Sequence, residues 1–575
     1  MKTTFNPIYM GADVDYKGDA LNIVRGPRGQ LVNKEMLDHQ TQFAQRVIHV
    51  SPRVYVSVGR GLGNCAMIEA DDGIIIVDTD SSVEAASEIL AEFRKITDKP
   101  VKAIIYTHYH YTGGTLAFVS PEDYGNVEIW AHENHMKNML STFGDISTGF
   151  FRRLHIFHGS FLPAEGEDGF AGEGLGPFYK NPKFQKETLG YLPPNHLIPD
   201  KEKTCAEICG LRFEFYPATS ETDDSMIIWM PDERVSFDNH AWPAFANLYS
   251  LRGTSFRDPL GWMRGIDILR TLRPEHLCSM HGVPLNGSDN IYQILTDYRD
   301  SIQYLYDSVV IGFNNGKSVE EIIAEIEIPR HLCSGVLNRE LYGEIDYHIR
   351  GIYDGLIGWF GNDAVECHRL TPDCEAAKMV DAFGGLNSAL SIADKALKDK
   401  EYIWAAQVAG YALRAHPDCD QARTIKANAL RMIARVTPAS GTRAFYMTQA
   451  LTLEGKVDPM AFRAAPSKEV IASLPYDTFI KSLRFQIDRR KIWDVDLKLA
   501  FVFTDIQKAS CMHIRRGVIE DLGDTADADV KIEMTFDTFA SILTGTNLSS
   551  LVKSGDIAVV GDAATCAAIM PLLEL

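Results

Sequence analysis

The chain has 575 residues, of which 45% are hydrophobic and 23% are charged, and its formal net charge is −20. This composition is typical of a globular protein with two to four domains. The acidic balance argues against a general nucleic-acid binder, because binding to phosphates relies on Lys and Arg. No stretch approaches the roughly 18 uninterrupted apolar residues of a membrane span, so we expect none.

The ten cysteines are scattered along the chain rather than gathered into a dense framework. This distribution favours reduced thiols over disulfides. The first residues, Met1 to Pro7, are not followed by an apolar core with a small-residue cleavage site, so we expect no signal peptide. Together these features predict a cytoplasmic protein.

Strand-like patterns begin after a lead-in of about 44 residues. The runs Val54–Val58 and Cys65–Ala70 read as strands, and Asp71–Gly73 is typical of a hairpin turn. The turn leads into Ile74–Asp80, a β-branched run of the kind that is buried on both faces of a sheet. The pattern therefore predicts three consecutive strands at the start of a layered domain.

A helix and a further strand follow and lead to a pair of histidines. Helical spacing predicts a helix over residues 82–94, and Val101–Tyr106 is the next buried strand. This order predicts an α/β domain with its site at the C-terminal ends of the strands. His108 and His110 come directly after the strand, and neutral imidazoles held there are ligands that zinc prefers. The alternative is a loop with two surface histidines.

The next part of the chain contains a long connection. A strand over Val127–Ala131 is followed by a helix from His132 to about Leu140, and then by about sixty residues rich in Gly, Pro and Phe. A connection of this length, including Gly166–Gly176, is typical of a lid or binding loop. His132 and His135 lie three residues apart on the helix, and we interpret them as structural.

Strands then resume, and polar residues follow several of them. The predicted strands are Leu211–Tyr216, Ser225–Met230, Arg234–Phe237 and Leu277–Met280. The polar residues at or near their ends are Glu221, Asp238 and His281.

This arrangement resembles the metallo-β-lactamase fold. The residues that carry the resemblance lie at successive strand ends and are Asp78, Thr107-His108-x-His110, Glu221, Asp238 and His281. One branch of that fold, the zinc-dependent alkyl sulfatases, is resembled by the segments 217–221, 247–253, 257–262, 342–343 and 352–359. The resemblance covers nearly the whole chain. It implies an αββα sandwich within a catalytic domain over residues 1–370, with a core at about 45–290.

The resemblance also implies a metal site. In the family one zinc is held by residues that correspond to His108, His110 and Glu221. Asp238 stands where the family usually has a Glu that bridges to a second zinc, and His281 matches the last histidine of that second site.

Two residues depart from the family pattern. The second zinc needs Asp-His directly after the histidine pair, and this chain has Tyr111 and Thr112. Neutral Thr and un-ionised Tyr are poor zinc ligands. We therefore predict one tightly bound zinc ion, with the second ion weak or absent, and with Asp238 or His281 completing the shell or orienting a water.

Catalytic and substrate-binding roles follow from the same resemblance. Asp238 is the predicted base. The family histidines ahead of Asn-Leu-Tyr are replaced by Trp242–Ala246, so the predicted proton donors to the leaving group are His240 and Tyr111. The residues predicted to bind the anionic head are Arg252, Asn247 and Tyr249. Arg257 is a weaker candidate, because it stands next to Asp258.

Two further regions follow the catalytic part. Helical spacing in Leu386–Leu397 and Trp404–Ala412 predicts paired helices within a region over residues 371–458. In alkyl sulfatases the corresponding segment mediates dimerisation, which implies a homodimer; the alternative is a helical subdomain packed only on its own chain. Residues 459–575 alternate as strands and end in a predicted helix, and they resemble a sterol-carrier-protein-like α+β domain.

These observations predict a metal-dependent hydrolase that cleaves an alkyl sulfate ester or a related small organic sulfate. One alternative is lyase-type C–O cleavage of a sulfo-oxy or similar metabolite on the same site, with Tyr111 transferring a proton. Another is a catalytically silent, dimeric homologue that binds amphiphiles.

Overall fold

The computed structural model describes residues 22–143, 145–177, 187–462, 468–485 and 487–562. Its contacts divide the chain into two compact units. The first unit contains the residues up to His135, Phe151–Thr188 and Pro194–Phe462. The second contains Met136–Phe150, Leu189–Pro193 and the chain from Arg463 onward.

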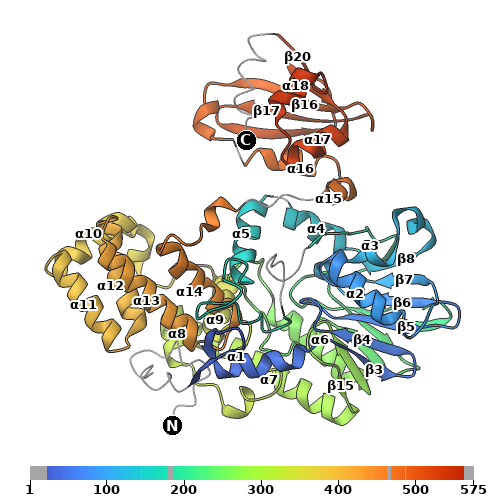
Figure 1. The fold of residues 1–575 in the computed structure, drawn as a ribbon, viewed down its shortest axis with the longest axis horizontal. Helices are drawn as coiled ribbons and strands as arrows, with labels where there is room; N and C mark the ends of the chain where they lie inside the picture. Colours follow the sequence, from blue (N-terminus) through green and yellow to red (C-terminus); the bar gives the residue numbers. More distant parts are fainter. Residues whose placement is uncertain (1–21, 144, 178–186, 463–467, 486, 563–575) are drawn as a thin grey trace. The chain divides into compact units, whose positions relative to one another are not determined.

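A seven-stranded sheet begins the first unit, in the order β3-β4-β5-β6-β7-β8-β9 (Figure 1). Its strands are β3 (Arg46–Ser51), β4 (Val54–Val58), β5 (Cys65–Glu69), β6 (Ile74–Val77), β7 (Val101–Ile105), β8 (Glu128–His132) and β9 (His196–Ile198). The pairs from β3 to β6 are antiparallel and those from β6 to β9 are parallel. Every residue of β6 is buried, as its β-branched composition predicts, and α2 (Val83–Phe93) connects it to β7.

A six-stranded sheet follows, in the order β10-β11-β12-β13-β14-β15. Its strands are β10 (Thr204–Ile208), β11 (Leu211–Pro217), β12 (Met226–Met230), β13 (Val235–Asp238), β14 (His276–Ser279) and β15 (Leu285–Asn286). The helix α6 (Pro259–Leu272) joins β13 to the parallel β14, and α7 (Ser288–Asn314) follows β15. Side chains of both sheets, such as Ile75 and Phe237, belong to one hydrophobic core. The predicted αββα sandwich is confirmed.

The long connection contains more regular structure than its composition indicates. The helices α4 (His135–Phe143) and α5 (Ser147–Phe157) lie in it or at its start. Phe151, Leu154 and Phe157 recur at helical spacing and are buried in α5, which is a signal that the abundant Gly and Pro of this stretch mask. Residues 178–186 of the connection lie outside the described residues.

The lead-in and the helical region complete the first unit. The lead-in forms a hairpin of β1 (Ile23–Arg25) and β2 (Leu31–Asn33), followed by α1 (Lys34–Gln40). The helices after α7 are α8 (Val319–Glu325), α9 (Ile345–Ile357), α10 (Pro372–Ala382), α11 (Leu386–Lys398), α12 (Tyr402–Ala415), α13 (Asp420–Val436) and α14 (Ser440–Leu453). Buried alanines such as Ala393 and Ala409 let α11 and α12 pack closely, so the predicted helix pair is confirmed (Figure 1). Over the described parts of the chain, no helix combines the length and the apolar character of a membrane span.

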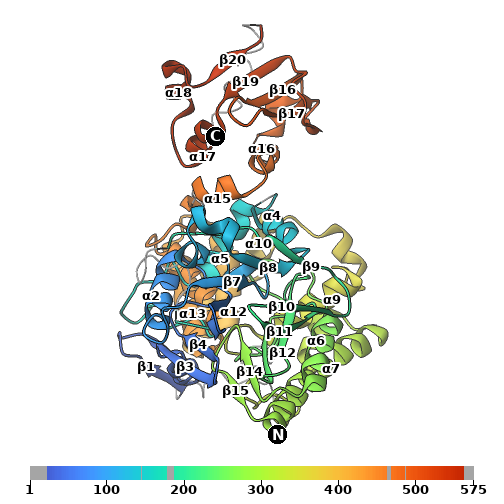
Figure 2. The same ribbon diagram turned by 90° about the vertical axis from the view of Figure 1, so that its right-hand side faces the viewer.

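The second unit has a five-stranded sheet in the order β18-β17-β16-β19-β20 (Figure 2). Its elements are α15 (Lys468–Ser473), α16 (Thr478–Leu483), β16 (Asp496–Phe503), β17 (Lys508–Arg515), β18 (Val518–Gly523), β19 (Val530–Met534), α17 (Phe536–Leu543), α18 (Leu548–Ser554) and β20 (Ala558–Val560). The turn between β17 and β18 has positive φ at Arg516 and Gly517, as in a type I′ hairpin. Met136, Leu140 and Leu189 pack against the core of this α+β unit.

Candidate metal centre

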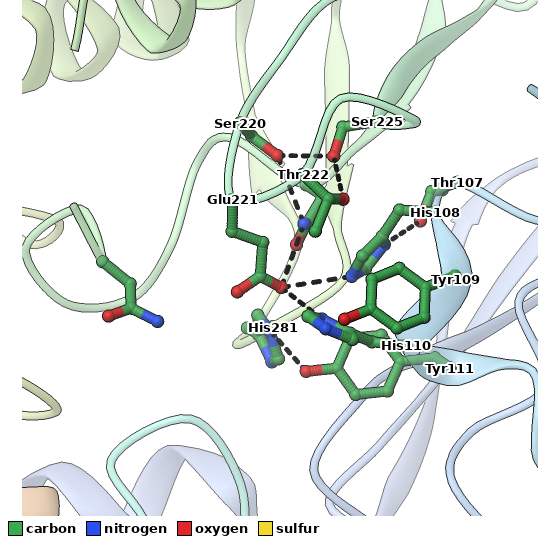
Figure 3. Close-up of polar contacts among 12 residues, drawn as sticks. Thr107, His108, Tyr109, His110, Tyr111, Ser220, Glu221, Thr222, Ser225 and His281 are labelled. Carbon is green, nitrogen blue, oxygen red and sulfur yellow. Dashed lines mark hydrogen bonds and ion pairs between the residues drawn. The ribbon is translucent and has the colours of Figure 1, made fainter. Parts of the chain in front are cut away.

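Three potential metal ligands meet at the edge where strands of the two sheets end. After β7 the chain enters a short 3₁₀ turn, η4 (Tyr109–Tyr111), which carries His110 and is preceded by His108. Glu221 comes from the loop between β11 and β12. One donor atom from each of the three residues lies within 4.8 Å of the other two, and Figure 3 shows the side chains converging. The structure therefore brings together the predicted ligands His108, His110 and Glu221.

Hydrogen bonding behind His108 determines which ring nitrogen faces the site. The Thr107 hydroxyl donates its proton to Asp78 Oδ2 at 2.6 Å, and Thr107 Oγ1 lies 3.0 Å from His108 Nδ1. Because that hydroxyl has only one proton, it accepts from a protonated Nδ1. When the ring is neutral, the lone pair of Nε2 therefore faces the site, and an oriented histidine of this kind is what metal sites use.

Both histidines face one carboxylate oxygen (Figure 3). Glu221 Oε1 lies 3.2 Å from His108 Nε2 and 2.7 Å from His110 Nδ1. Either a proton on His108 Nε2 or a metal cation must lie between these two atoms, because two lone pairs repel each other. Burial alone would lower the pKa of His108, but the hydrogen bond to Glu221 and the charges of Glu221 and Asp78 outweigh burial and raise it. Tetrahedral zinc at about 2.0–2.1 Å from each ligand holds its ligand atoms about 3.3 Å apart. The 3.2 Å distance matches this spacing and the 2.7 Å distance is shorter, so it is the chemistry of the donor set that fits a zinc-type ion.

The Glu221 loop is held in place by a hydroxyl network. Ser220 Oγ donates to Ser225 Oγ at 2.8 Å, and Thr222 Oγ1 lies 3.2 Å from the same oxygen (Figure 3). Asn239 Nδ2 lies 3.3 Å from Ser220 Oγ and 3.4 Å from Glu221 Oε1. The carboxylate is thus positioned by its own loop and by the residue after β13.

The electrostatics of the buried site favour an ionised Glu221. Burial alone would raise the pKa of its carboxyl group, but the charge of Arg257 and the hydrogen bonds with both histidines outweigh burial and hold the pKa well below its usual range. Burial lowers the pKa of His110 to about 4, with the nearby Arg252 acting in the same direction. A neutral imidazole beside a carboxylate anion is a suitable pair of metal ligands.

His281 lies outside the three-residue group and is bound on both ring nitrogens. Its Nδ1 lies 2.9 Å from the carbonyl oxygen of Leu62, which can only accept, so Nδ1 carries the proton. Its Nε2 lies 3.0 Å from the Tyr111 hydroxyl, which therefore donates to it (Figure 3). Burial lowers the pKa of His281 to about 4. His281 Nε2, the ring nitrogen that could otherwise bind a metal ion, thus accepts a hydrogen bond from the Tyr111 hydroxyl.

Asp238 ends β13 and is also outside the three-residue group. Its Oδ1 accepts from the backbone N–H groups of His240 and Ala241 at 2.6 and 2.8 Å. Its Oδ2 is buried and has no hydrogen-bond partner among the described residues. Burial raises the pKa of this carboxyl group to about 6, against the two backbone hydrogen bonds. Asp238 therefore keeps one oxygen that could receive a proton.

The ring of His240 packs against α6. A Cβ built at Gly265 would lie 2.2 Å from His240 Nε2, so the ring fills the space that this glycine leaves open. The Trp262 ring lies 6.3 Å from it, edge to face, and burial lowers the pKa of His240 to about 4. The structure thus places His240 on the helix side of the loop.

The predicted anion-binding residues take different places. Arg252 is 6% exposed, and its charge lowers the pKa of His110, so it lies close to the metal group. Tyr249 donates its backbone N–H to His348 Nδ1 at 3.0 Å and packs on Gly351. The backbone carbonyl of Asn247 accepts from Arg257 Nη1 at 2.6 Å.

Three contributors near the site were not among the predicted site residues. Asp78 supports His108 through Thr107, as described above. His135 stacks on Tyr106 at 5.2 Å and forms an ion pair with Asp224 at 3.4 Å, and the charge of Asp224 acts on His108. The spacing of residues along the chain does not reveal the contact between His135 and Asp224, because the two are far apart in the sequence. A charged residue next to an apolar strand is nevertheless a signal of a functional site.

Comparisons with known proteins cover the same regions. The metallo-beta-lactamase superfamily model matches residues 58–237. The alkyl sulfatase dimerisation model matches residues 318–456, and the alkyl sulfatase C-terminal model matches residues 464–575.

Characterised relatives match along nearly the full length. A linear primary-alkylsulfatase of Pseudomonas sp. (strain ATCC 19151) is 34% identical over 516 residues, covering 86% of this chain and 96% of the relative. An (R)-specific secondary-alkylsulfatase of Pseudomonas sp. is 27% identical and covers 93% of this chain and 82% of that protein. The solved structure of a double mutant of the sec-alkyl sulfatase PisA1 superposes with a TM-score of 0.84 at 25% identity, covering 96% of this chain and 91% of that one. The chain belongs to the alkyl sulfatase family of the metallo-β-lactamase superfamily.

Proposed function

We propose that this protein hydrolyses alkyl sulfate esters, using one divalent cation held by His108, His110 and Glu221. The observation that carries the proposal is the group of His108, His110 and Glu221, whose donor atoms lie within 4.8 Å of one another at a site where His108 and Glu221 are buried. A divalent cation there supplies Lewis-acid polarisation of an ester oxygen and lowers the pKa of a water molecule. Family membership supports the sulfate ester as the bond that is cleaved.

The chain's own residues have separate roles in this proposal. Arg252, buried and close to His110, binds the sulfate, because a planar guanidinium matches an oxyanion with paired donors. Asp238 receives a proton on Oδ2, which has no hydrogen-bond partner among the described residues. Tyr111 is better placed than His240 to give a proton to the leaving group, because its hydroxyl lies beside His281 while the His240 ring packs on Gly265.

We propose that only one ion binds tightly. The contact between Tyr111 and His281 supports this, because it occupies the ring nitrogen that a second ion would need. Thr112, in place of the family's histidine, bonds to the Tyr109 carbonyl at 3.2 Å. We also propose a homodimer, because the matched dimerisation model covers the helices α8 to α14. The lyase and amphiphile-binding alternatives gain no support, since the relatives named above are all sulfatases.

The test combines metal analysis with turnover. Purified protein should contain about one zinc-type ion per chain and release sulfate from dodecyl sulfate, and a chelator should remove both the ion and the activity. His108→Ala should lower the bound metal and cut turnover by at least about 100-fold. The control is His196→Ala, which removes a histidine on β9 that stacks on Trp130 outside the site and should leave both unchanged. Metal-free protein with full activity, or full activity after His108→Ala, would overturn the proposal.

A further inference from the structure

The two arginines that follow β13 face different partners, although they are five residues apart in the sequence. Arg257 is 2% exposed, and its Nη2 lies 3.1 Å from Glu221 Oε2. Arg252 influences His110 and Tyr342 electrostatically. The neighbour of Arg257, Asp258, caps α6 instead, because its Oδ1 accepts from the Leu260 N–H at 3.0 Å. Arg257 thus pairs with a metal ligand rather than with the adjacent carboxylate.

The guanidinium of Arg257 is held by three separate acceptors. Nη2 faces Glu221 Oε2, Nη1 donates to the Asn247 carbonyl at 2.6 Å, and Nε donates to Thr254 Oγ1 at 3.1 Å. These bonds use different nitrogens of one rigid plane, so they define both the position and the rotation of the group. A lysine at this position would keep the charge but could not hold the same three directions.

The carboxylate of Glu221 is divided between two sets of partners. Its Oε1 faces His108 and His110, while its Oε2 faces Arg257. With Oε2 bound to a fixed guanidinium, the carboxylate cannot rotate to present both oxygens to the metal site. Supporting groups of this kind orient metal ligands, and their loss typically weakens metal binding about 10- to 100-fold.

We propose that Arg257 is a positioning residue that fixes Glu221 as a one-oxygen metal ligand, while Arg252 alone of this pair binds the substrate anion. This inference rests on the proposed function, because it requires a cation at the three-residue group. In this arrangement the Asn247 carbonyl supports Arg257 and acts on the substrate only through it.

The test measures zinc affinity in the full-length protein after metal removal, by competition with a chromophoric chelator. Arg257→Lys keeps the positive charge and removes the fixed geometry, so the Kd for zinc should rise about 10- to 100-fold. The matched variant Arg252→Lys should leave the Kd for zinc within about twofold and raise the KM for dodecyl sulfate instead. Thr254 is half-buried, and Thr254→Val removes one of the three hydrogen bonds that hold the Arg257 guanidinium. This variant should raise the Kd for zinc by a few-fold.

The zinc Kd of these variants distinguishes a positioning role for Arg257 from an anion-binding role. An unchanged zinc Kd in both Arg257→Lys and Thr254→Val, or an equal rise in Arg252→Lys, would overturn the inference. If Arg257→Lys does not fold, as judged by circular dichroism and the unfolding midpoint, Thr254→Val alone decides. Failure of wild-type protein to bind any divalent metal would instead refute the proposed function, so the two failures are distinguishable.

Discussion

Tyr111 and His281 contact each other beside the ring of His108. The phenol donates to His281 Nε2 at 3.0 Å, and its ring packs against Gly63, where an added Cβ would lie 2.6 Å from it. The phenol carries its proton in this contact, because it is the donor. A neutral phenol is a poor zinc ligand, which is why we propose that only one ion binds tightly.

On the proposal that one ion binds tightly and that Tyr111 and Thr112 replace two ligands of the family, introducing those ligands should add a second ion. In the double variant Tyr111→Asp with Thr112→His, a carboxylate and an imidazole replace two poor ligands and release His281 Nε2, so zinc per chain should rise from about one to about two. Elemental analysis of dialysed protein measures this ratio. Tyr111→Phe is the control, because it removes the hydroxyl without adding a ligand. Its zinc content should stay at about one ion per chain. A ratio of two in wild-type protein would contradict the prediction.

His39 on α1 provides a residue-scale prediction of pH dependence. Its Nε2 lies 2.6 Å from the Gly174 carbonyl and its Nδ1 lies 2.7 Å from Gln42 Nε2, so a neutral ring with the proton on Nε2 satisfies both partners. Burial lowers its pKa to about 4. Between pH 6.5 and 4 the unfolded chain binds the proton that the folded protein does not, so stability falls as the pH falls.

The non-titrating variant His39→Gln isolates this effect. As the pH drops from 7 to 5, wild-type protein should lose up to about 1.4 kcal/mol per pH unit relative to the variant in the free energy of unfolding. Denaturant unfolding at three pH values measures the difference. The control His416→Gln changes an exposed histidine, so its free energy of unfolding should change with pH as that of the wild type does. A constant difference between wild type and His39→Gln would contradict the assigned protonation.

At the scale of elements, the Gly-rich segment around Gly166–Gly176 is anchored by α13 and α14. Arg431 Nε lies 2.9 Å from Asp168 Oδ2, and Ser440 Oγ donates to the Glu173 carbonyl at 2.7 Å. The buried Arg443 donates to three carbonyls, those of Gly169 at 2.9 Å, Ala434 at 3.0 Å and Leu31 at 3.2 Å. The composition of the segment predicts a lid or binding loop, and these contacts hold the segment against the helical region.

Arg443→Met should therefore destabilise the protein. The variant leaves the buried carbonyls of Gly169 and Ala434 and the partly buried carbonyl of Leu31 without their charged donor, which should cost about 3 kcal/mol. The unfolding midpoint in denaturant reports this loss. Arg423→Met is the control, because Arg423 pairs with Asp420 at the surface of α13 and such pairs contribute about 0–1 kcal/mol. Equal losses in the two variants would show that Arg443 does not anchor the segment.

At the scale of the whole molecule, the helical region predicts a dimer. The matched dimerisation model spans residues 318–456, which include α8 to α14. One chain has a mass of 64.1 kDa, so light scattering at micromolar concentration should give about twice that value. Dilution should leave the mass unchanged if the interface is large and apolar. A mass near that of one chain would contradict the proposal.

Local pattern predicted most of the elements. The alternation in Leu497–Phe503 and the helical spacing in Leu386–Leu397 each reflect burial of one face, and both elements form where expected. Burial on both faces likewise made Ile74–Val77 recognisable as an inner strand. The helix α5 was missed, because neighbouring Gly and Pro residues dominate the composition of its stretch.

The sequence by itself determined the ligand types and their places at strand ends, because parallel strands bring their C-terminal loops to one edge. His108 and His110 could be named on that ground, Glu221 was assigned with them by the resemblance to the alkyl sulfatases, and all three converge in the structure. Tertiary structure decided the partners: Arg257 binds Glu221 and not Asp258, and the Tyr111 hydroxyl binds His281. Such choices depend on side-chain directions set by packing between distant segments, which spacing along the chain does not encode.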